Sequence, residues 1–300
     1  MPGFHIKKKQ VDIVMNSPRF PVYIISKGRW ERRQTSKTME KCGIPYKIVV
    51  EPSEYDRYAE NINPDNIIKL PSDFSKLNQG GIPVRNWVWE DSIKNGHKFH
   101  WIFDDNIESI MRFNNNMRIK CKTPTPLYII EDFVLRYENV AIAGMNYHLF
   151  CPAYEARPPV TFNRRVYSNL LIRNDIPYRW RGKYNEDTDL CLRALKDKWV
   201  TTLFNAFLIE KRATMTQGGG NTDSIYDEGD NRYQFAKSLQ EQHPDVVKIG
   251  KRCGRVHHVV NYKPFETNKL IRKPGLNVPE GINNYGMVLK KKNKVFDGVK

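Results

Sequence analysis

The chain has 300 residues, of which 40% are hydrophobic and 12% aromatic, so it can build one large α/β domain and is too apolar to be disordered throughout. Its formal net charge of +16 favours a polyanionic partner such as nucleic acid. Five cysteines without a CxxC pair, and the lack of any run of about 18 apolar residues, argue against a secreted or membrane-spanning protein, so we expect a cytoplasmic one.

The first half of the chain alternates short β-rich runs with helical stretches. Four runs rich in branched and aromatic residues predict buried strands, at residues 22–25, 46–50, 66–70 and 99–103. Between them, residues 31–41 predict a helix that ends at Gly43, and residues 87–94 predict a helix that stops at Gly96. This order predicts an α/β fold, Rossmann-like, with a mostly parallel central sheet covered by helices.

The second half is less regular. Residues 163–172 predict another strand, and the spacing of apolar residues after Asn185 predicts a helix. Three consecutive glycines, residues 218–220, predict a mobile loop, which either closes over a diphosphate or is a plain linker.

Positive charge is concentrated at the C-terminal end. Residues 251–300 contain twelve Lys or Arg and three Asp or Glu, so this segment carries +9 of the +16. We expect a basic C-terminal extension that contacts nucleic-acid phosphates, with a role in solubility as the alternative.

Two adjacent acids and an amide follow the strand predicted at residues 99–103. Asp104, Asp105 and Asn106 offer oxygen ligands of the kind that Mg²⁺ or Mn²⁺ prefers. A bound ion of this kind would neutralise the charge on a departing diphosphate. Acids in this position also serve as turn or helix-cap residues.

A second acidic group opens the helix predicted after Asn185. Glu186, Asp187 and Asp189 lie in its first turn, where the helix dipole favours negative charge. One of these carboxylates could instead take a proton from an acceptor hydroxyl during sugar transfer.

Five short segments in a fixed order give the chain its resemblance to a known family. They are Ile25-Ser26-Lys27-Gly28-Arg29, Val49-Val50-Glu51-Pro52 with Tyr55, Gln79-Gly80-Gly81-Ile82 with Arg85, Phe103-Asp104-Asp105-Asn106, and Glu186-Asp187-Thr188-Asp189-Leu190. Over residues 21–196 this set resembles the GT-A glycosyltransferases, and more narrowly the TET-associated glycosyltransferases of bacteriophages.

The resemblance implies a GT-A fold and transfer of a sugar from a UDP-sugar to the hydroxyl of a 5-hydroxymethylpyrimidine, such as 5-hydroxymethylcytosine, in DNA. It implies a GT-A glycosyltransferase domain at residues 21–260, between an N-terminal segment, residues 1–20, and the basic C-terminal extension, residues 261–300. The location would be the cytoplasm of the host cell.

The resemblance also implies roles for individual residues. Asp187, with Glu186, would act as the catalytic base. Asp105 and Asn106 would hold Mn²⁺ or Mg²⁺, although Asn106 departs from a strict DXD pattern. A late histidine, His257, fits as a further ligand without being demanded by the resemblance, and a structural histidine is the alternative. The donor would contact Ser26, Lys27, Gly28, Arg29, Glu51, Tyr55, Gly80, Gly81, Arg85 and Asp104.

Other interpretations remain open from the sequence alone. Tyr147, Tyr178, Trp180 and Arg181 either stack a nucleic-acid base or belong to the core. A GT-A enzyme acting on a protein or glycan, a non-enzymatic DNA-binding protein and a metal-dependent nuclease are the alternatives. The sugar, the modified base, inversion against retention and the oligomeric state are undetermined.

Overall fold

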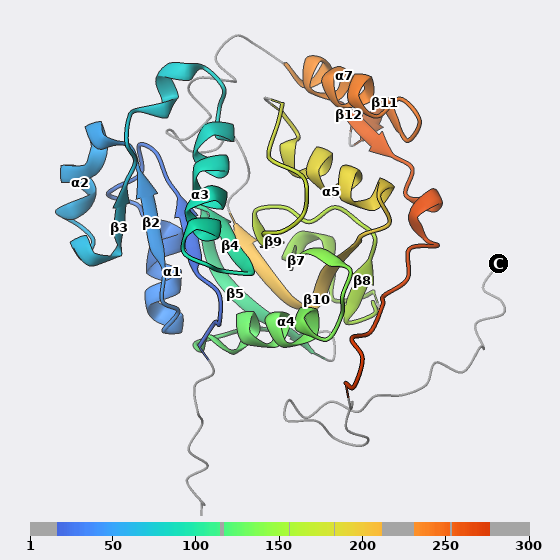
Figure 1. The fold of residues 1–300 in the computed structure, drawn as a ribbon, viewed down its shortest axis with the longest axis horizontal. Coiled ribbons are helices and arrows are strands. Elements are labelled where there is room, and N and C mark those ends of the chain that lie inside the picture. Colours follow the sequence, from blue (N-terminus) through green and yellow to red (C-terminus); the bar gives the residue numbers. More distant parts are fainter. Residues whose placement is uncertain are drawn as a thin grey trace, which may run out of the picture.

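A ten-stranded sheet forms the centre of the molecule in the computed structural model (Figure 1). The structure describes residues 17–114, 117–155, 157–182, 184–211, 231–252 and 254–276. The strand order is β3-β2-β1-β4-β9-β7-β10-β5-β6, and β8 pairs with β10 outside this path.

The N-terminal half is a series of parallel β-α units. Its main elements are β1 (Val22–Ile25), α1 (Gln34–Cys42), β2 (Lys47–Val50), α2 (Tyr55–Ala59), β3 (Ile67–Lys69), α3 (Ile82–Lys94) and β4 (Phe99–Asp104). Strands β3, β2, β1 and β4 are all parallel. Gly43 ends α1 in a left-handed conformation with φ 62°, as its position after the helix predicts.

The second half completes the sheet with strands of both directions. It contains β5 (Ile107–Asn114), β6 (Met117–Lys120), α4 (Thr125–Leu135), β7 (Val140–Tyr147), β8 (Val160–Phe162), β9 (Asn169–Arg173), α5 (Glu186–Lys196) and β10 (Val200–Lys211). β9 lies antiparallel between β4 and β7, whereas β10 is parallel to β7. β5 and β8 are antiparallel to β10, so most strands still point one way.

Helices cover both faces of the sheet. Residues of α1 and α4 share one apolar cluster, and residues of α3 and α5 share another. Successive residues of β4 alternate between them: Trp101 and Phe103 join the first cluster and Ile102 the second. The result is a three-layer α/β arrangement, which confirms the predicted fold class.

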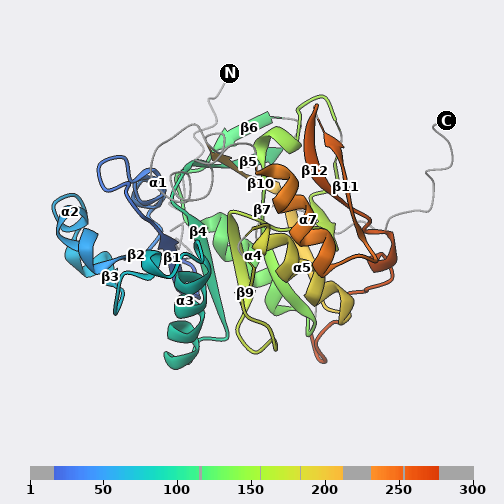
Figure 2. The ribbon, with the colours of Figure 1, turned by 90° about the horizontal axis from the view of Figure 1, so that it is seen from above.

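A smaller C-terminal unit packs on α5. It consists of α7 (Arg232–Gln242) and a hairpin of β11 (Val247–Arg252) and β12 (Arg255–Val260), which lie beside α5 in Figure 2. Leu192 and Leu195 of α5 form an apolar cluster with Leu239, Val247 and the downstream Phe265. The hairpin and the following chain are therefore fastened to the sheet-bearing body.

Some sequence expectations need correction. Helix α3 begins at Ile82 rather than at residue 87, with a proline in its first turn, so Arg85 lies on a helix. The strand expected at residues 163–172 is only β9, and residues 163–168 form a loop.

The glycine loop at 218–220 and the lysines at 290–294 lie outside the described residues, and the domain limits remain predictions. Within the described part, no helix is long and apolar enough to cross a membrane.

Gly144 of β7 allows a loop to cross the sheet closely. A Cβ atom there would lie 2.2 Å from the carbonyl oxygen of Asn169 and 2.5 Å from a methyl carbon of Val166. Such distances are well inside van der Waals contact, so the loop carrying residues 166–169 approaches β7 only because this residue has no side chain.

We predict that Gly144→Ala lowers the free energy of unfolding by about 1–3 kcal/mol, because the added methyl group displaces backbone rather than a flexible side chain. Urea denaturation of the two proteins measures the difference. An unchanged midpoint with unchanged slope would contradict the close approach.

Candidate active site

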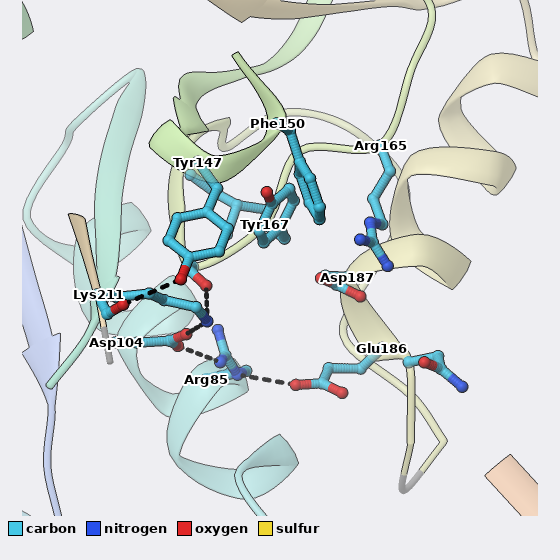
Figure 3. A pocket seen from close by; sticks show the side chains of 12 residues that line it. Arg85, Asp104, Tyr147, Phe150, Arg165, Tyr167, Glu186, Asp187 and Lys211 are labelled. Atoms are coloured by element: carbon cyan, nitrogen blue, oxygen red, sulfur yellow. Dashed lines mark hydrogen bonds and ion pairs between the residues drawn. The ribbon is translucent and has the colours of Figure 1, made fainter. Parts of the chain in front are cut away.

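A pocket of ≈ 370 Å³ lies where the carboxyl ends of three strands meet. Asp104, Tyr147 and Lys211 are the last residues of β4, β7 and β10, which all point the same way. Open α/β sheets bind ligands at this edge. The lining residues are Arg85, Asp104, Tyr147, Phe150, Arg165, Tyr167, Ser168, Leu170, Asn185, Glu186, Asp187 and Lys211 (Figure 3).

Asp104 is held between two cations. Its Oδ1 accepts a hydrogen bond from Arg85 at 3.0 Å, and its Oδ2 lies 3.8 Å from the Lys211 ammonium. Burial alone would raise the pKa of Asp104, but Lys211 and Arg85 outweigh it and hold that pKa below its usual value. Lys211 also donates to Ser168 Oγ at 2.6 Å, so the lysine is fixed from two sides.

Arg85 connects Asp104 to the start of α5. Its Nε lies 3.6 Å from Glu186 Oε1, and its guanidinium lies over the Trp180 ring. Burial raises the pKa of Glu186. The negative charge of the neighbouring Asp187 raises this pKa further, whereas Arg85 lowers it. The two acids at the beginning of α5 are therefore in different electrostatic environments.

One carboxylate oxygen of Asp187, Oδ2, accepts no hydrogen bond from the described part of the chain. Its Oδ1 accepts hydrogen bonds from the Thr188 backbone N–H at 2.6 Å and the Thr188 hydroxyl at 3.2 Å. Figure 3 shows Asp187 and Arg165 pointing toward one another, and Arg165 also lies over the Tyr167 ring. Asp187 is therefore oriented by its own helix start and keeps Oδ2 for another group.

Asp189 has a different role from Asp187, although only one residue separates them. Its buried carboxylate binds Arg181 at 2.9 Å, Arg193 at 2.8 Å and His243 Nε2 at 2.9 Å. It does not line the pocket. Asp189 joins α5 to α7 and to the chain before α5, which is a structural role.

Asp105 faces away from the pocket, toward the loop after β1. Its Oδ2 accepts from Ser26 Oγ at 2.9 Å and its Oδ1 accepts from Arg29, while Ser26 also bonds the Tyr58 hydroxyl. The carboxylate is almost fully buried, and burial raises the pKa of Asp105 even though Arg29 opposes the change. Asp105 therefore fixes the Ser26-to-Arg29 loop.

The remaining predicted donor residues lie in this loop and at the starts of α2 and α3. Gly28 N–H donates to Glu54, and Lys27 lies 4.0 Å from Glu51. Glu51 is buried and accepts two hydrogen bonds from Ser75. Tyr55 begins α2, and Gly80 and Gly81 directly precede α3.

The predicted site residues thus fall into separate groups. Arg85, Asp104, Glu186 and Asp187 meet in the pocket, whereas the residues around Ser26 lie outside its lining. His257 lies in β12, opposite Gly250, and also does not line the pocket, so its role as a metal ligand stays a prediction. In the described residues no group of three or more His, Cys, Asp or Glu could hold a metal ion.

Several pocket residues were missed in the sequence. Lys211 and Phe150 belong to segments that the sequence did not resolve into elements, whereas Arg165 and Tyr167 fell in a stretch predicted as a strand and lie in the loop before β9. A signal was present for Lys211, because a charge that follows an apolar strand repeats the pattern of Asp104. Tyr147, expected to contact a base or the core, lines the pocket with its hydroxyl donating to the Lys211 carbonyl at 3.1 Å.

The Rossmann-like sheet, with a charged pocket at the carboxyl ends of its strands, is consistent with a glycosyltransferase fold. The model of the TET-associated glycosyltransferase family matches residues 20–220, and the chain belongs to that family. No match was found among curated proteins. The family resemblance and the enzyme class, a nucleotide-sugar-dependent glycosyltransferase, are thereby confirmed.

We predict that Asp189→Asn lowers the free energy of unfolding by about 3 kcal/mol, because it leaves the largely buried guanidinium of Arg193 without its counter-charge. Burial opposes ionisation, but hydrogen bonds from His243 and Arg181 hold the pKa of Asp189 below its usual value. Ionised Asp189 therefore stabilises the fold above about pH 4, and this contribution is lost as the pH falls through the lowered pKa.

Thermal unfolding of both proteins across this pH range tests the prediction. Asp187→Asn is the matched control, since Asp187 lies in the same helix turn and makes only local hydrogen bonds. Equal destabilisation by the two substitutions would contradict the structural role of Asp189.

Proposed function

We propose that this enzyme transfers a sugar from a UDP-sugar to the hydroxyl of a 5-hydroxymethylpyrimidine in DNA. The observation that carries the proposal is Asp187, whose Oδ2 accepts no hydrogen bond within the described residues and which lies in a pocket that also holds Arg85, Arg165 and Lys211. Sugar transfer needs both a base for the acceptor hydroxyl and positive charge for the leaving diphosphate.

The cations of the pocket fit the donor's diphosphate. Arg85 and Lys211 are held by Asp104, and Arg165 faces Asp187, so their positions are set before a substrate arrives. Guanidinium and ammonium groups bind phosphate oxygens strongly. The nucleotide would extend toward the Ser26-to-Arg29 loop, with Glu51, Tyr55 and the Gly80-Gly81 turn next to it.

A divalent ion is part of the proposal. The charges that line the pocket cancel, because three cations (Arg85, Arg165 and Lys211) stand against three carboxylates (Asp104, Glu186 and Asp187). An incoming diphosphate therefore adds negative charge that the lining does not compensate. Asn106 Oδ1 is buried without a hydrogen-bond partner among the described residues, which fits an oxygen ligand. Asp104 and Asn106 would hold Mg²⁺ or Mn²⁺, which would neutralise the leaving diphosphate, while Asp105 would have to leave Arg29 to join them.

Asp187 would act as the general base. Its free oxygen takes the proton of the acceptor hydroxyl while that oxygen forms a bond to the anomeric carbon and the bond from this carbon to the diphosphate breaks. A direct displacement of this kind inverts the anomeric centre. Hydrogen bonds from Thr188 keep Oδ1 occupied and so aim Oδ2 at the reacting hydroxyl.

The net charge of +16 supports DNA as the acceptor rather than a protein or a glycan. The deciding experiment incubates the enzyme with hydroxymethylated DNA and a panel of nucleotide sugars, followed by mass spectrometry of the nucleosides. We expect a mass gain of one sugar on the hydroxymethylated base. No gain on any base, together with transfer to a protein or glycan, would overturn the DNA acceptor.

We predict that Asp187→Asn lowers kcat on the order of 10²-fold or more while the KM for the donor stays near its wild-type value, because the amide keeps the shape but cannot accept the proton. Glu186→Gln is the matched comparison, since Glu186 binds Arg85 and should act on donor affinity. A larger loss of kcat in Glu186→Gln than in Asp187→Asn would make Glu186 the base.

We also predict that removal of divalent ions with a chelator abolishes transfer and that Mn²⁺ or Mg²⁺ restores it. Asn106→Ala should raise the ion concentration needed for half-maximal activity. Full transfer in chelator-treated buffer would show that Arg85, Arg165 and Lys211 alone stabilise the leaving diphosphate.

A further inference from the structure

Large apolar side chains are exposed at the rim of the pocket. In the segment after β7, Leu149 is 60% exposed and Tyr154 is 91% exposed, and Phe150 is 37% exposed although it also lines the pocket. Exposed apolar side chains gathered in one place are typical of an interaction surface.

This rim is a fixed structure. Arg118 of β6 donates to the carbonyl oxygens of His148 at 2.9 Å and Cys151 at 2.7 Å, and so ties the edge strand to the segment that carries Leu149. Phe150 packs against the rings of Tyr147 and Tyr167, with centroids 5.5 Å and 6.1 Å away. Leu149 is therefore held next to an anchored aromatic residue at the entrance of the pocket.

The positive charge of the rim indicates the class of partner that it binds. Residues 112–122 and 147–165 contain seven Lys or Arg and one acidic residue, Glu155, and acids of other segments pair with two of these cations, Lys120 with Glu210 and Arg164 with Glu266. A surface that combines positive charge with exposed apolar and aromatic side chains fits nucleic acid, which offers phosphates on its outside and base faces within.

The pocket itself offers one aromatic side and one carboxylate side. In Figure 3 the rings of Tyr147, Phe150 and Tyr167 lie on the side opposite Glu186. Asp187 lines the pocket together with Phe150, so an acceptor hydroxyl reaches Asp187 only by entering the pocket. A base that is stacked within a duplex cannot enter, whereas a base rotated out of the stack can rest against the aromatic rings.

We propose that the enzyme takes its target base out of a DNA duplex, and that Leu149 inserts into the base stack at the position the target base has left. This inference rests on the proposed function, because it concerns the same pocket and the same acceptor. Phe150 and Tyr147 receive the extruded base, and the basic residues of the rim hold the flanking phosphates.

The test compares Leu149→Ala with wild type on the same hydroxymethylated sequence in three forms: a matched duplex, a duplex with a mismatch at the target, and a single strand. We expect kcat/KM to fall roughly tenfold or more on the matched duplex, less on the mismatched duplex, and little on the single strand, because only the paired base must be extracted. Ile271→Ala is the matched control, since Ile271 is equally apolar and 53% exposed but lies beside Asn139, at the opposite end of β7.

A second measurement detects extrusion of the target base independently of sugar transfer. With 2-aminopurine placed next to the target in a duplex, wild type should increase its fluorescence on binding, and Leu149→Ala should reduce that increase while Ile271→Ala leaves it unchanged. An equal loss of activity on duplex and single strand, or no loss, would overturn the inference, as would dissociation of a dimer by Leu149→Ala. If wild type transfers sugar to no form of DNA, the proposed function fails, and the fluorescence measurement still decides on extrusion.

Discussion

The placement of Asp104 between Arg85 and Lys211 organises the active site. These three residues come from β4, α3 and the end of β10, which are far apart in sequence and meet only when the parallel strands end at one edge. The shared carboxylate keeps two cations from repelling one another in a partly buried space. Arg85 then extends the network to Glu186 and so fixes how the start of α5 faces the sheet.

The start of α5 separates an acid that faces the pocket from a structural acid by helix geometry. Two positions along a helix differ by about 200° around its axis, so Asp187 and Asp189 point to nearly opposite sides. One faces the pocket, and the other is buried with Arg193, Arg181 and His243. The dipole at this helix end favours both negative charges. The residues around each carboxylate then determine whether it faces the pocket or joins parts of the fold.

Much of the sheet could be predicted, because the first four parallel strands are apolar runs with acidic or glycine-containing ends. The family resemblance implied donor contacts for Arg85 and Asp104 and the role of base for Glu186 and Asp187, and these four residues line one pocket. Lys211 and Arg165 could not be placed in the same way. Lys211 does follow an apolar run, but which residues it meets depends on β10 pairing with β7, β5 and β8. The position of Arg165 depends on the segment that passes close to Gly144, and long-range contacts of this kind leave no local pattern.

The different positions of Asp104 and Asp105 follow from the backbone of a strand. Successive side chains of a strand point to opposite faces, and Asp105 directly follows the last residue of β4, so the two adjacent acids face different sides here. Asp104 keeps the pocket side, and Asp105 turns to Ser26 and Arg29, where it holds the loop expected to face the nucleotide. The acidic pair thus serves two different parts of the molecule: Asp104 positions two cations of the pocket, and Asp105 holds the Ser26-to-Arg29 loop. Adjacency in the sequence therefore does not bring these two carboxylates into one site, because each is paired with cations that come from a different part of the chain.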